Sequence, residues 1–163
     1  MSKTVFKTCL LSCFLILCSC GTQKTTAYSS VETSCIATEL DGSFTLRVEG
    51  RGRNAVDAYK EAGKQAVYDI LFTPILRKNG GATKYIQPIF VQKQKAAYEE
   101  NEAYFNAFFA DGGDYEKYFS MKEKRDLSSI YHRTNTQTVC ITTVCVYKNK
   151  LREKLIQDGV IER

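Results

Sequence analysis

The chain has 163 residues, of which 44% are hydrophobic, and its 23 basic and 18 acidic residues give a formal net charge of +5. The length corresponds to one domain with an adequate core. The basic excess is small and scattered, which excludes the clustered Lys and Arg footprint of a nucleic-acid-binding domain, so we expect no nucleic acid partner.

Residues 1–19 have the pattern of a secretory signal peptide. Lys3 and Lys7 precede a ten-residue apolar stretch from Cys9 to Cys18. This stretch is too short for a transmembrane helix, which needs roughly 20 residues. We therefore expect this segment to be cleaved.

The end of that segment, Leu17-Cys18-Ser19-Cys20, resembles the lipobox of bacterial lipoproteins. The resemblance implies a diacylglycerol on the Cys20 thiol and a further acyl chain, such as palmitate, on the freed amine. Gly21 stands where inner-membrane lipoproteins have Asp, so the resemblance implies a periplasm-facing anchor in the outer membrane. The alternative is an ordinary secreted protein in which Cys20 stands there by coincidence.

Cleavage would leave 144 residues with a formal charge of +3. Residues 20–34 are small and polar after the anchoring cysteine and predict a flexible tether. Residues 35–163 then form a single domain.

The first half of this domain predicts a hairpin followed by a helix. Asp41-Gly42 lies between two alternating stretches, which is a strong hairpin signal. Asn54 is a suitable N-cap for a helix through residues 55–72, and Pro74 would end it. The helix carries a stripe of small residues that would let it lie close to a sheet: Ala55, Ala58, Ala62, Gly63 and Ala66.

The second half predicts further strands and helices. The expected elements are an edge strand over 85–92, helices over 99–110 and 149–159 with a short helical turn at 115–119, and paired strands over 127–132 and 138–147. Strands that come as hairpins around intervening helices indicate an α+β fold. We expect two layers, with a mainly antiparallel sheet packed by two or three helices.

The run Gly50-Arg51-Gly52-Arg53-Asn54-Ala55 matches the letters of a dinucleotide-binding turn. The preceding stretch, however, alternates as in a sheet with one wet face, with Phe44, Leu46 and Val48 on one side and Thr45, Arg47 and Glu49 on the other. A second strand ending in an acid about 20 residues later is also missing, because the chain there is still helical. We therefore expect no nucleotide, and interpret Gly50 and Gly52 as conformational residues at a tight turn.

The alternating strand, the G-x-G turn, the Asn54 cap, the spaced alanines and the late strand V-C-I-T-T-V-C-V resemble a group of small envelope lipoproteins. These are similar in turn to the N-terminal domain of the flagellar assembly protein FlgT. The resemblance covers roughly residues 43–161. It implies an α+β module used in envelope assembly, without catalytic residues.

Three cysteines remain in the domain, Cys35, Cys140 and Cys145. Cys140 and Cys145 would point to opposite faces of one strand, so they cannot pair with each other. A disulfide between Cys35 and either of them stays open, as does burial of all three as thiols.

No residue pattern indicates catalysis, a metal or a cofactor. The only histidine is His132, and no C-x-x-C spacing exists. Glu99, Glu100 and Glu102 would face different directions on a helix, as on a solvated face. We therefore expect a protein that is not an enzyme.

An aromatic segment offers the candidate surface for a partner or ligand: Tyr98, Tyr104, Phe105, Phe109, Tyr115 and Tyr118. The alternative is that these rings form core.

Two functions are compatible with this segment. One is a non-catalytic interaction module that binds another envelope protein through a sheet edge or the aromatic residues. The other is a lipoprotein that binds a glycan or peptidoglycan fragment. A cavity lined by Tyr98, Tyr104 and Tyr115 would favour the ligand, whereas a filled core with an exposed apolar patch would favour the interaction module.

Overall fold

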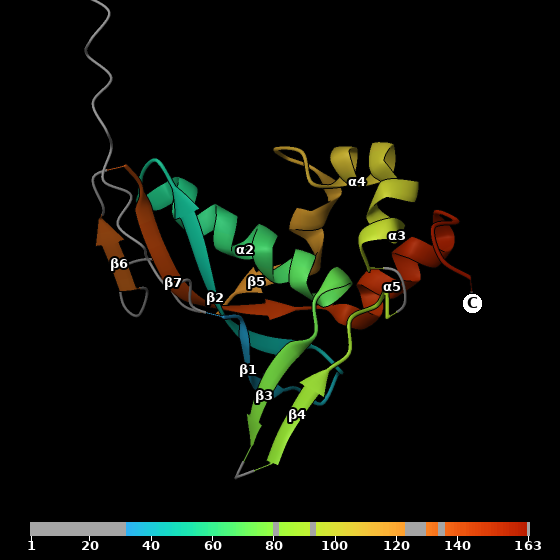
Figure 1. The fold of residues 1–163 in the computed structure, drawn as a ribbon, viewed down its shortest axis with the longest axis horizontal. Helices are drawn as coiled ribbons and strands as arrows, with labels where there is room; N and C mark the ends of the chain where they lie inside the picture. Colours follow the sequence, from blue (N-terminus) through green and yellow to red (C-terminus); the bar gives the residue numbers. More distant parts are fainter. Residues whose placement is uncertain (1–31, 80–81, 92–93, 123–129, 134–135, 163) are drawn as a thin grey trace, which may run out of the picture.

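The computed structural model describes residues 32–79, 82–91, 94–122, 130–133 and 136–162 (Figure 1). The predicted signal peptide, Cys20 and nearly all of the predicted tether lie outside these residues. The first strand begins at Ser34, and Thr33 already makes contacts with the folded domain.

The fold is α+β, as predicted. The described residues form one seven-stranded sheet in the order β4-β3-β1-β2-β7-β5, and β6 also pairs with β7. Only the β1–β3 pairing is parallel. The strands are β1 (Ser34–Thr38), β2 (Phe44–Gly52), β3 (Ile75–Asn79), β4 (Ala82–Ile86), β5 (Phe119–Met121), β6 (Ile130–Arg133) and β7 (Thr138–Val146).

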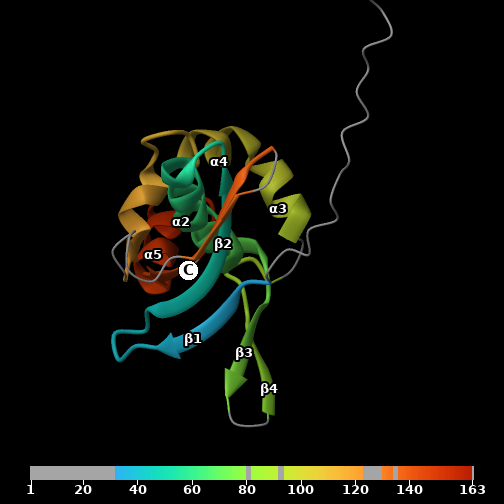
Figure 2. The same ribbon diagram turned by 90° about the vertical axis from the view of Figure 1, so that its left-hand side faces the viewer.

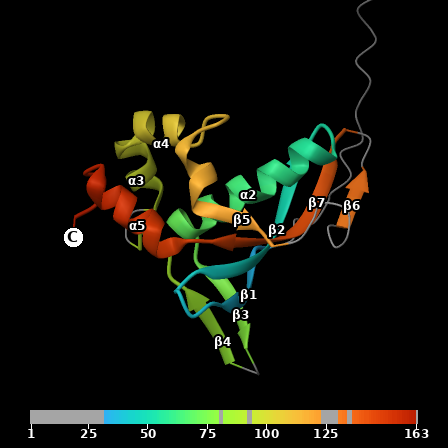
Figure 3. The ribbon, with the colours of Figure 1, turned by 180° about the vertical axis from the view of Figure 1, so that it is seen from behind.

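Four α-helices and one 3-10 helix are described: α2 (Ala55–Phe72), α3 (Gln94–Glu100), α4 (Glu102–Phe108), η1 (Asp114–Tyr118) and α5 (Lys148–Gln157). Helix α2 lies across the two central strands, β2 and β7, and the other helices gather beside its C-terminal half (Figures 1 and 3). The core lies between these helices and the sheet.

The first hairpin and α2 form as predicted. Gly42 has a φ of 78°, the left-handed conformation that glycine adopts without strain, and it turns the chain between β1 and β2. The Asn54 side chain accepts hydrogen bonds from the backbone nitrogens of Val56 and Asp57 at 2.9 and 3.0 Å. The helix ends at Phe72, two residues before Pro74.

The small-residue stripe of α2 faces the sheet, and Gly50 is the reason that it can lie so close. A Cβ on Gly50 would stand 2.1 Å from the carbonyl oxygen of Ala58 and 2.3 Å from the nitrogen of Ala62. Gly50 and Gly52 lie within β2, and neither has a positive φ. Their interpretation as conformational turn residues was wrong: glycine is needed here for space.

The β3–β4 hairpin departs from the prediction. The expected edge strand over 85–92 was wrong, because β4 ends at Ile86, two residues before Pro88, and β3 was not predicted. Only Ser34 and Cys35 of β1 pair with β3. The rest of the hairpin projects away from the sheet (Figures 1 and 2). We call residues 75–79 and 82–86 the β3–β4 arm.

The predicted helix over 99–110 was also wrong in extent. The chain forms α3 and α4 instead, with a break at Asn101, whose side-chain amide donates to the carbonyl of Ala97 at 3.0 Å. The short helical turn appears as η1, and β6 pairs with β7 as expected. Helix α5 buries Leu151 and Leu155 and is followed by Gly159 with a φ of 74°.

The face of β2 that carries Thr45, Arg47 and Glu49 is less exposed to solvent than the alternating sequence predicts. Arg47 is exposed, but Thr45 and Glu49 are buried. The Thr45 hydroxyl donates to Glu39 Oε1 at 2.7 Å, and Arg51 Nε donates to Glu49 Oε1 at 2.7 Å. These bonds satisfy polar groups that burial would otherwise leave without partners.

Cys35, Cys140 and Cys145 are all buried free thiols. Burial raises the pKa of Cys35, and the nearby charge of Arg77 opposes this effect. The structure therefore agrees with burial of all three cysteines as thiols, and not with a disulfide between Cys35 and Cys140 or Cys145.

Candidate functional site

The six aromatic residues predicted as a surface belong mainly to the core. Phe105, Phe109 and Tyr115 are only 0%, 7% and 5% exposed. Tyr98, Tyr104 and Tyr118 are half-buried and pack against this core. The structure thus brings the six residues together but leaves only parts of three rings accessible to a partner.

Phe105 of α4 is the centre of this aromatic cluster. Its ring lies 5.1 Å from that of Phe72 in α2 and 5.3 Å from that of Tyr98 in α3, measured between centroids. It also contacts the rings of Phe90, Tyr104, Phe108 and Phe109. The edge-to-face and stacked arrangements fill the space between the helices, as expected for core.

The tyrosine hydroxyls are used for structure. Tyr104 donates to Asp158 Oδ2 at 2.7 Å, and Tyr98 donates to Asn106 Oδ1 at 3.0 Å. Burial raises the pKa of Tyr104, and it raises the pKa of Tyr115 to about 12. Both phenols are therefore neutral at physiological pH and serve as hydrogen-bond donors, not as bases.

A cleft of about 240 Å³ lies at the accessible edge of the aromatic cluster. Its lining includes Tyr68, Tyr98 and Phe109, together with Glu61, Lys64, Gln65 and Asn106. Neither Tyr104 nor Tyr115 lines it. Its volume is below the roughly 300 to 1,000 Å³ of typical ligand pockets.

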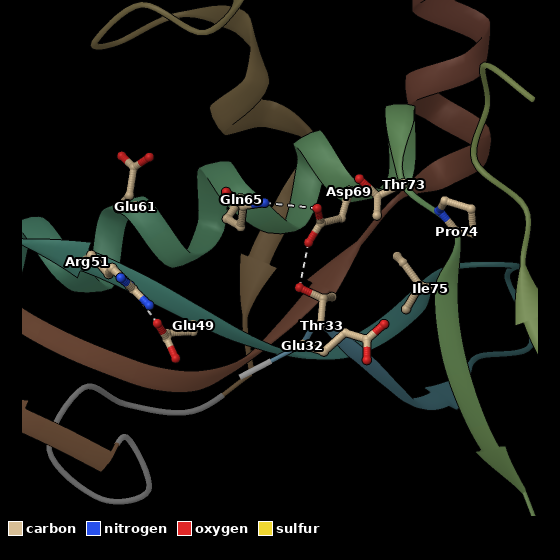
Figure 4. Close-up of a pocket in the computed structure, with 10 residues that line it drawn as sticks. All are labelled: Glu32, Thr33, Glu49, Arg51, Glu61, Gln65, Asp69, Thr73, Pro74 and Ile75. Carbon is tan, nitrogen blue, oxygen red and sulfur yellow. Dashed lines mark hydrogen bonds and ion pairs between the residues drawn. The ribbon is translucent and has the colours of Figure 1, made fainter. Parts of the chain in front are cut away.

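A larger, polar groove of about 670 Å³ adjoins this cleft along α2, and Glu61 and Gln65 line both (Figure 4). We call it the Asp69 groove. Helix α2 contributes Glu61, Gln65 and Asp69, strand β2 contributes Glu49 and Arg51, and the remaining lining residues are Glu32, Thr33, Thr73, Pro74 and Ile75.

Asp69 is the most buried carboxylate of the groove, with 5% exposure. Its two oxygens accept hydrogen bonds from Thr33 Oγ1 at 2.5 Å and Gln65 Nε2 at 2.9 Å (Figure 4). Burial raises the pKa of Asp69, and hydrogen bonds from Thr33, Gln65 and Thr73 oppose this effect. Through the hydrogen bond from Thr33, the Asp69 side chain holds the residue before β1 against α2.

The groove is acidic overall. Among the described residues, its lining includes four carboxyl side chains, those of Glu32, Glu49, Glu61 and Asp69, and one guanidinium, that of Arg51. Across the part of the chain that the structure describes, no group of three or more His, Cys, Asp or Glu residues is arranged to hold a metal ion. The arrangement suits a cationic group better than an anion.

Strand β1 pairs with only part of β2 beside this groove. Strand β1 pairs only with residues 44–47 of β2, whereas β7 pairs with the strand over its whole length. In the described residues, therefore, no strand lies beside residues 48–52 on the β1 side. Glu49 and Arg51 of this stretch line the groove.

The other candidates from the sequence are not brought into a common site. Glu99 and Glu100 on α3 and Glu102 on α4 are exposed, as expected for a solvated face. His132 lies on β6, and its side chain lies outside the described residues. Among the described helices, none has the length and hydrophobicity needed to cross a bilayer.

The Asp69 groove was not predicted from the sequence. Thr33 and Asp69 are 36 positions apart, and no motif marks their approach. The arm had a signal in the sequence that the prediction did not use, because Asn79-Gly80 is a dipeptide typical of hairpin turns.

No family model matches the chain, and neither the curated proteins nor the solved structures contain a match to it. The resemblance to the envelope lipoproteins and to FlgT accordingly stays a prediction.

Proposed function

We propose that this chain is an outer-membrane lipoprotein, anchored through Cys20 and facing the periplasm, whose α+β domain is a non-catalytic interaction module in envelope assembly. The anchor is argued from the signal pattern and the lipobox of residues 17–20. Two acyl chains or more make such an attachment effectively permanent, because each buried CH₂ contributes about 0.8 kcal/mol.

The filled aromatic core is the observation that carries the interaction module. The side chains of Phe72, Phe105 and Phe109 occupy the space in which a ligand between helices and sheet would lie. Outside the core, the domain offers partners a projecting arm and an open polar groove. Exposed apolar side chains near this region, Ile36 and Tyr85, are 55% and 56% exposed.

A glycan-binding lipoprotein is the second candidate, and the cleft beside Tyr68 and Tyr98 favours it. Aromatic faces with neighbouring amide and charged groups, here Gln65 and Asn106, are suited to a sugar. The small volume of this cleft and the absence of Tyr104 and Tyr115 from its lining make it the weaker candidate.

Replacement of Cys20 tests the anchor. Cys20→Ala removes the thiol that would carry the diacylglycerol, so we expect loss of metabolic labelling by radioactive palmitate and loss of the protein from the membrane fraction. Cys18→Ala is the matched control, because Ala also fits the small-residue position of the lipobox, and it should be labelled normally. A Cys20→Ala variant that stays with the membranes after a carbonate wash would contradict the lipoprotein assignment.

A binding measurement separates the two functions. Titration of the full chain with soluble peptidoglycan fragments, followed by tyrosine fluorescence, should show no saturable change if the domain is an interaction module. Saturation in the parent that Tyr68→Ala abolishes would establish the ligand-binding alternative instead.

A further inference from the structure

We propose that the β3–β4 arm binds an anionic lipid surface and so fixes how the domain sits on the membrane that holds it. The inference rests on the proposed lipid anchor, because the anchor brings the arm to a bilayer. It is argued from the charge of the arm, from the side chains on its two faces and from the place at which the chain enters the domain.

The arm is basic in sequence. Residues 75–86 contain Arg77, Lys78 and Lys84 and no acid. Arg77 and Lys84 are direct partners in the β3–β4 register, so both side chains leave the same face of the hairpin. Lys84 is exposed and Arg77 is half-buried. This face therefore carries positive charge, which is complementary to the phosphates of anionic lipids.

The other face of the arm carries an aromatic ring. Leu76 pairs with Tyr85, so these two side chains leave the face opposite to that of Arg77 and Lys84. Leu76 is half-buried, whereas Tyr85 is 56% exposed. Tyrosine is enriched at membrane–water interfaces, where its ring lies at the level of the headgroups. Cations alone would suit an acidic protein equally well, and the exposed tyrosine beside them favours a lipid surface.

The arm begins where the chain enters the domain. Ser34, the first residue of β1, pairs with Leu76 in the arm. From Leu76 the arm extends away from the sheet to Asn79 (Figures 1 and 2), a distance of roughly 10 Å for three residues. Cys20 lies 13 positions before Thr33, and a chain of this length spans at most roughly 45 Å. The far end of the arm is thus within reach of a bilayer in which Cys20 is anchored.

Three cations are sufficient for this role because the domain is already confined near the bilayer. Each Lys or Arg close to an anionic membrane strengthens binding about fivefold, so three strengthen it roughly a hundredfold. For a free protein this gives only weak attachment. For an anchored domain the contact is intramolecular, and the same gain determines which side of the domain faces the bilayer.

Vesicle flotation of the full chain carrying Cys20→Ala tests the arm without the proposed acyl chains. The arm variant adds Arg77→Gln, Lys78→Gln and Lys84→Gln, which remove charge and keep long polar side chains. On vesicles of equal parts phosphatidylcholine and phosphatidylglycerol, the arm variant should bind at least about tenfold more weakly than Cys20→Ala alone. On vesicles of phosphatidylcholine the two proteins should bind alike. Any binding through residues 1–19 is common to both proteins and cancels in the comparison.

Two further variants, also in the Cys20→Ala chain, are the controls. Lys60→Gln, Lys150→Gln and Arg152→Gln together remove the same charge at exposed positions outside the arm, and should leave binding to the anionic vesicles within about threefold of Cys20→Ala alone. Arg77→Lys with Lys84→Arg changes the side chains but keeps the charge of the arm, and should bind as Cys20→Ala alone does. Raising the salt concentration should remove the difference between the arm variant and Cys20→Ala alone, because exposed charges are screened.

Equal binding of the arm variant and Cys20→Ala alone to the anionic vesicles would overturn the proposal, and so would an equal loss in the Lys60, Lys150 and Arg152 variant. The first result would leave an acidic protein surface as the partner of the arm. The outcome is independent of the test of the anchor. A chain that takes up no palmitate but shows the arm effect contradicts the anchor alone, and a labelled chain without the arm effect contradicts the arm alone.

Discussion

The hydroxyl of Thr33 and the carboxylate of Asp69 form a 2.5 Å hydrogen bond between the residue before β1 and the last turns of α2. This hydrogen bond lies in the Asp69 groove. The lining of the groove also includes the carboxyl groups of Glu32, Glu49 and Glu61 and the guanidinium of Arg51. Asp69 therefore links the protonation of the groove to the stability of the domain.

Asp69→Asn tests this link. Because burial raises the pKa of Asp69, the folded protein holds this proton more tightly than the unfolded chain does. The stability from this group is complete below its ordinary pKa of 3.8 and is lost as the pH rises through the raised value. The Asn variant does not titrate there, so its melting temperature relative to the parent should increase between about pH 4 and pH 7.

Asp114→Asn is the control of opposite sign. The hydrogen bond and charge of Lys117 lower the pKa of Asp114. The stability that Asp114 contributes is therefore present above its ordinary pKa of 3.8 and is lost as the pH falls through the lowered pKa. Its melting temperature relative to the parent should fall as the pH rises. Parallel pH curves for the parent and the Asp69 variant would contradict the raised pKa.

Larger side chains on the inner stripe of α2 should destabilise the domain. Ala62 and Ala66 are fully buried, and the backbone of α2 at Ala62 lies against Gly50. Overpacking typically costs about 1 to 3 kcal/mol, so Ala62→Leu or Ala66→Leu should lower the melting temperature by several degrees.

Lys60→Leu, at an exposed position of the same helix, should change melting little. Thermal scans of the full chain compare the three variants. If the two buried variants melt like the parent, α2 is not packed as closely as the structure indicates.

The aromatic cluster should affect stability through its central ring. Phe105→Ala removes a fully buried side chain and should cost about 3 to 5 kcal/mol in free energy of unfolding, measured by urea denaturation. Tyr104→Phe removes only the hydrogen bond to Asp158 and should cost about 1 kcal/mol. Similar losses for the two variants would place Phe105 outside the core.

Nucleotides should not bind to the Gly50-x-Gly52 run. Strand β2 has antiparallel neighbours on both sides, and the two glycines face the backbone of α2 instead of a phosphate. Calorimetry with NAD and ATP should show no saturable heat. A dissociation constant below about 100 μM, or roughly −5.5 kcal/mol, would establish the nucleotide site that we reject.

The sequence predicted those elements whose signals are local. Asn54 and Pro74 mark the two ends of α2 because a side-chain cap and a missing N–H act within a few residues. Asp41-Gly42 fixes the first hairpin for the same reason. The α+β class followed from the order of such elements along the chain.

The candidate site could not be predicted in this way. The Asp69 groove depends on residues far apart in the sequence, and only the packing of α2 against the sheet brings them together. The aromatic residues were identified, but their role was not, because ring spacing on a helix is the same for a buried face and a binding face. Phe105 and Tyr98 share a segment but differ in burial.

The central pairing of β2 with β7 has a consequence for how the chain folds. Val48 pairs with Thr142, so the ladder in the middle of the sheet joins positions more than 90 residues apart. Contacts of such high sequence separation require a large loop to close first, which slows folding. During synthesis the β1–β2 hairpin and α2 can form early, because their contacts are close in sequence. The edge of β2 that pairs with β7, however, has no partner until residues 138–146 have emerged, and until then it needs protection from association.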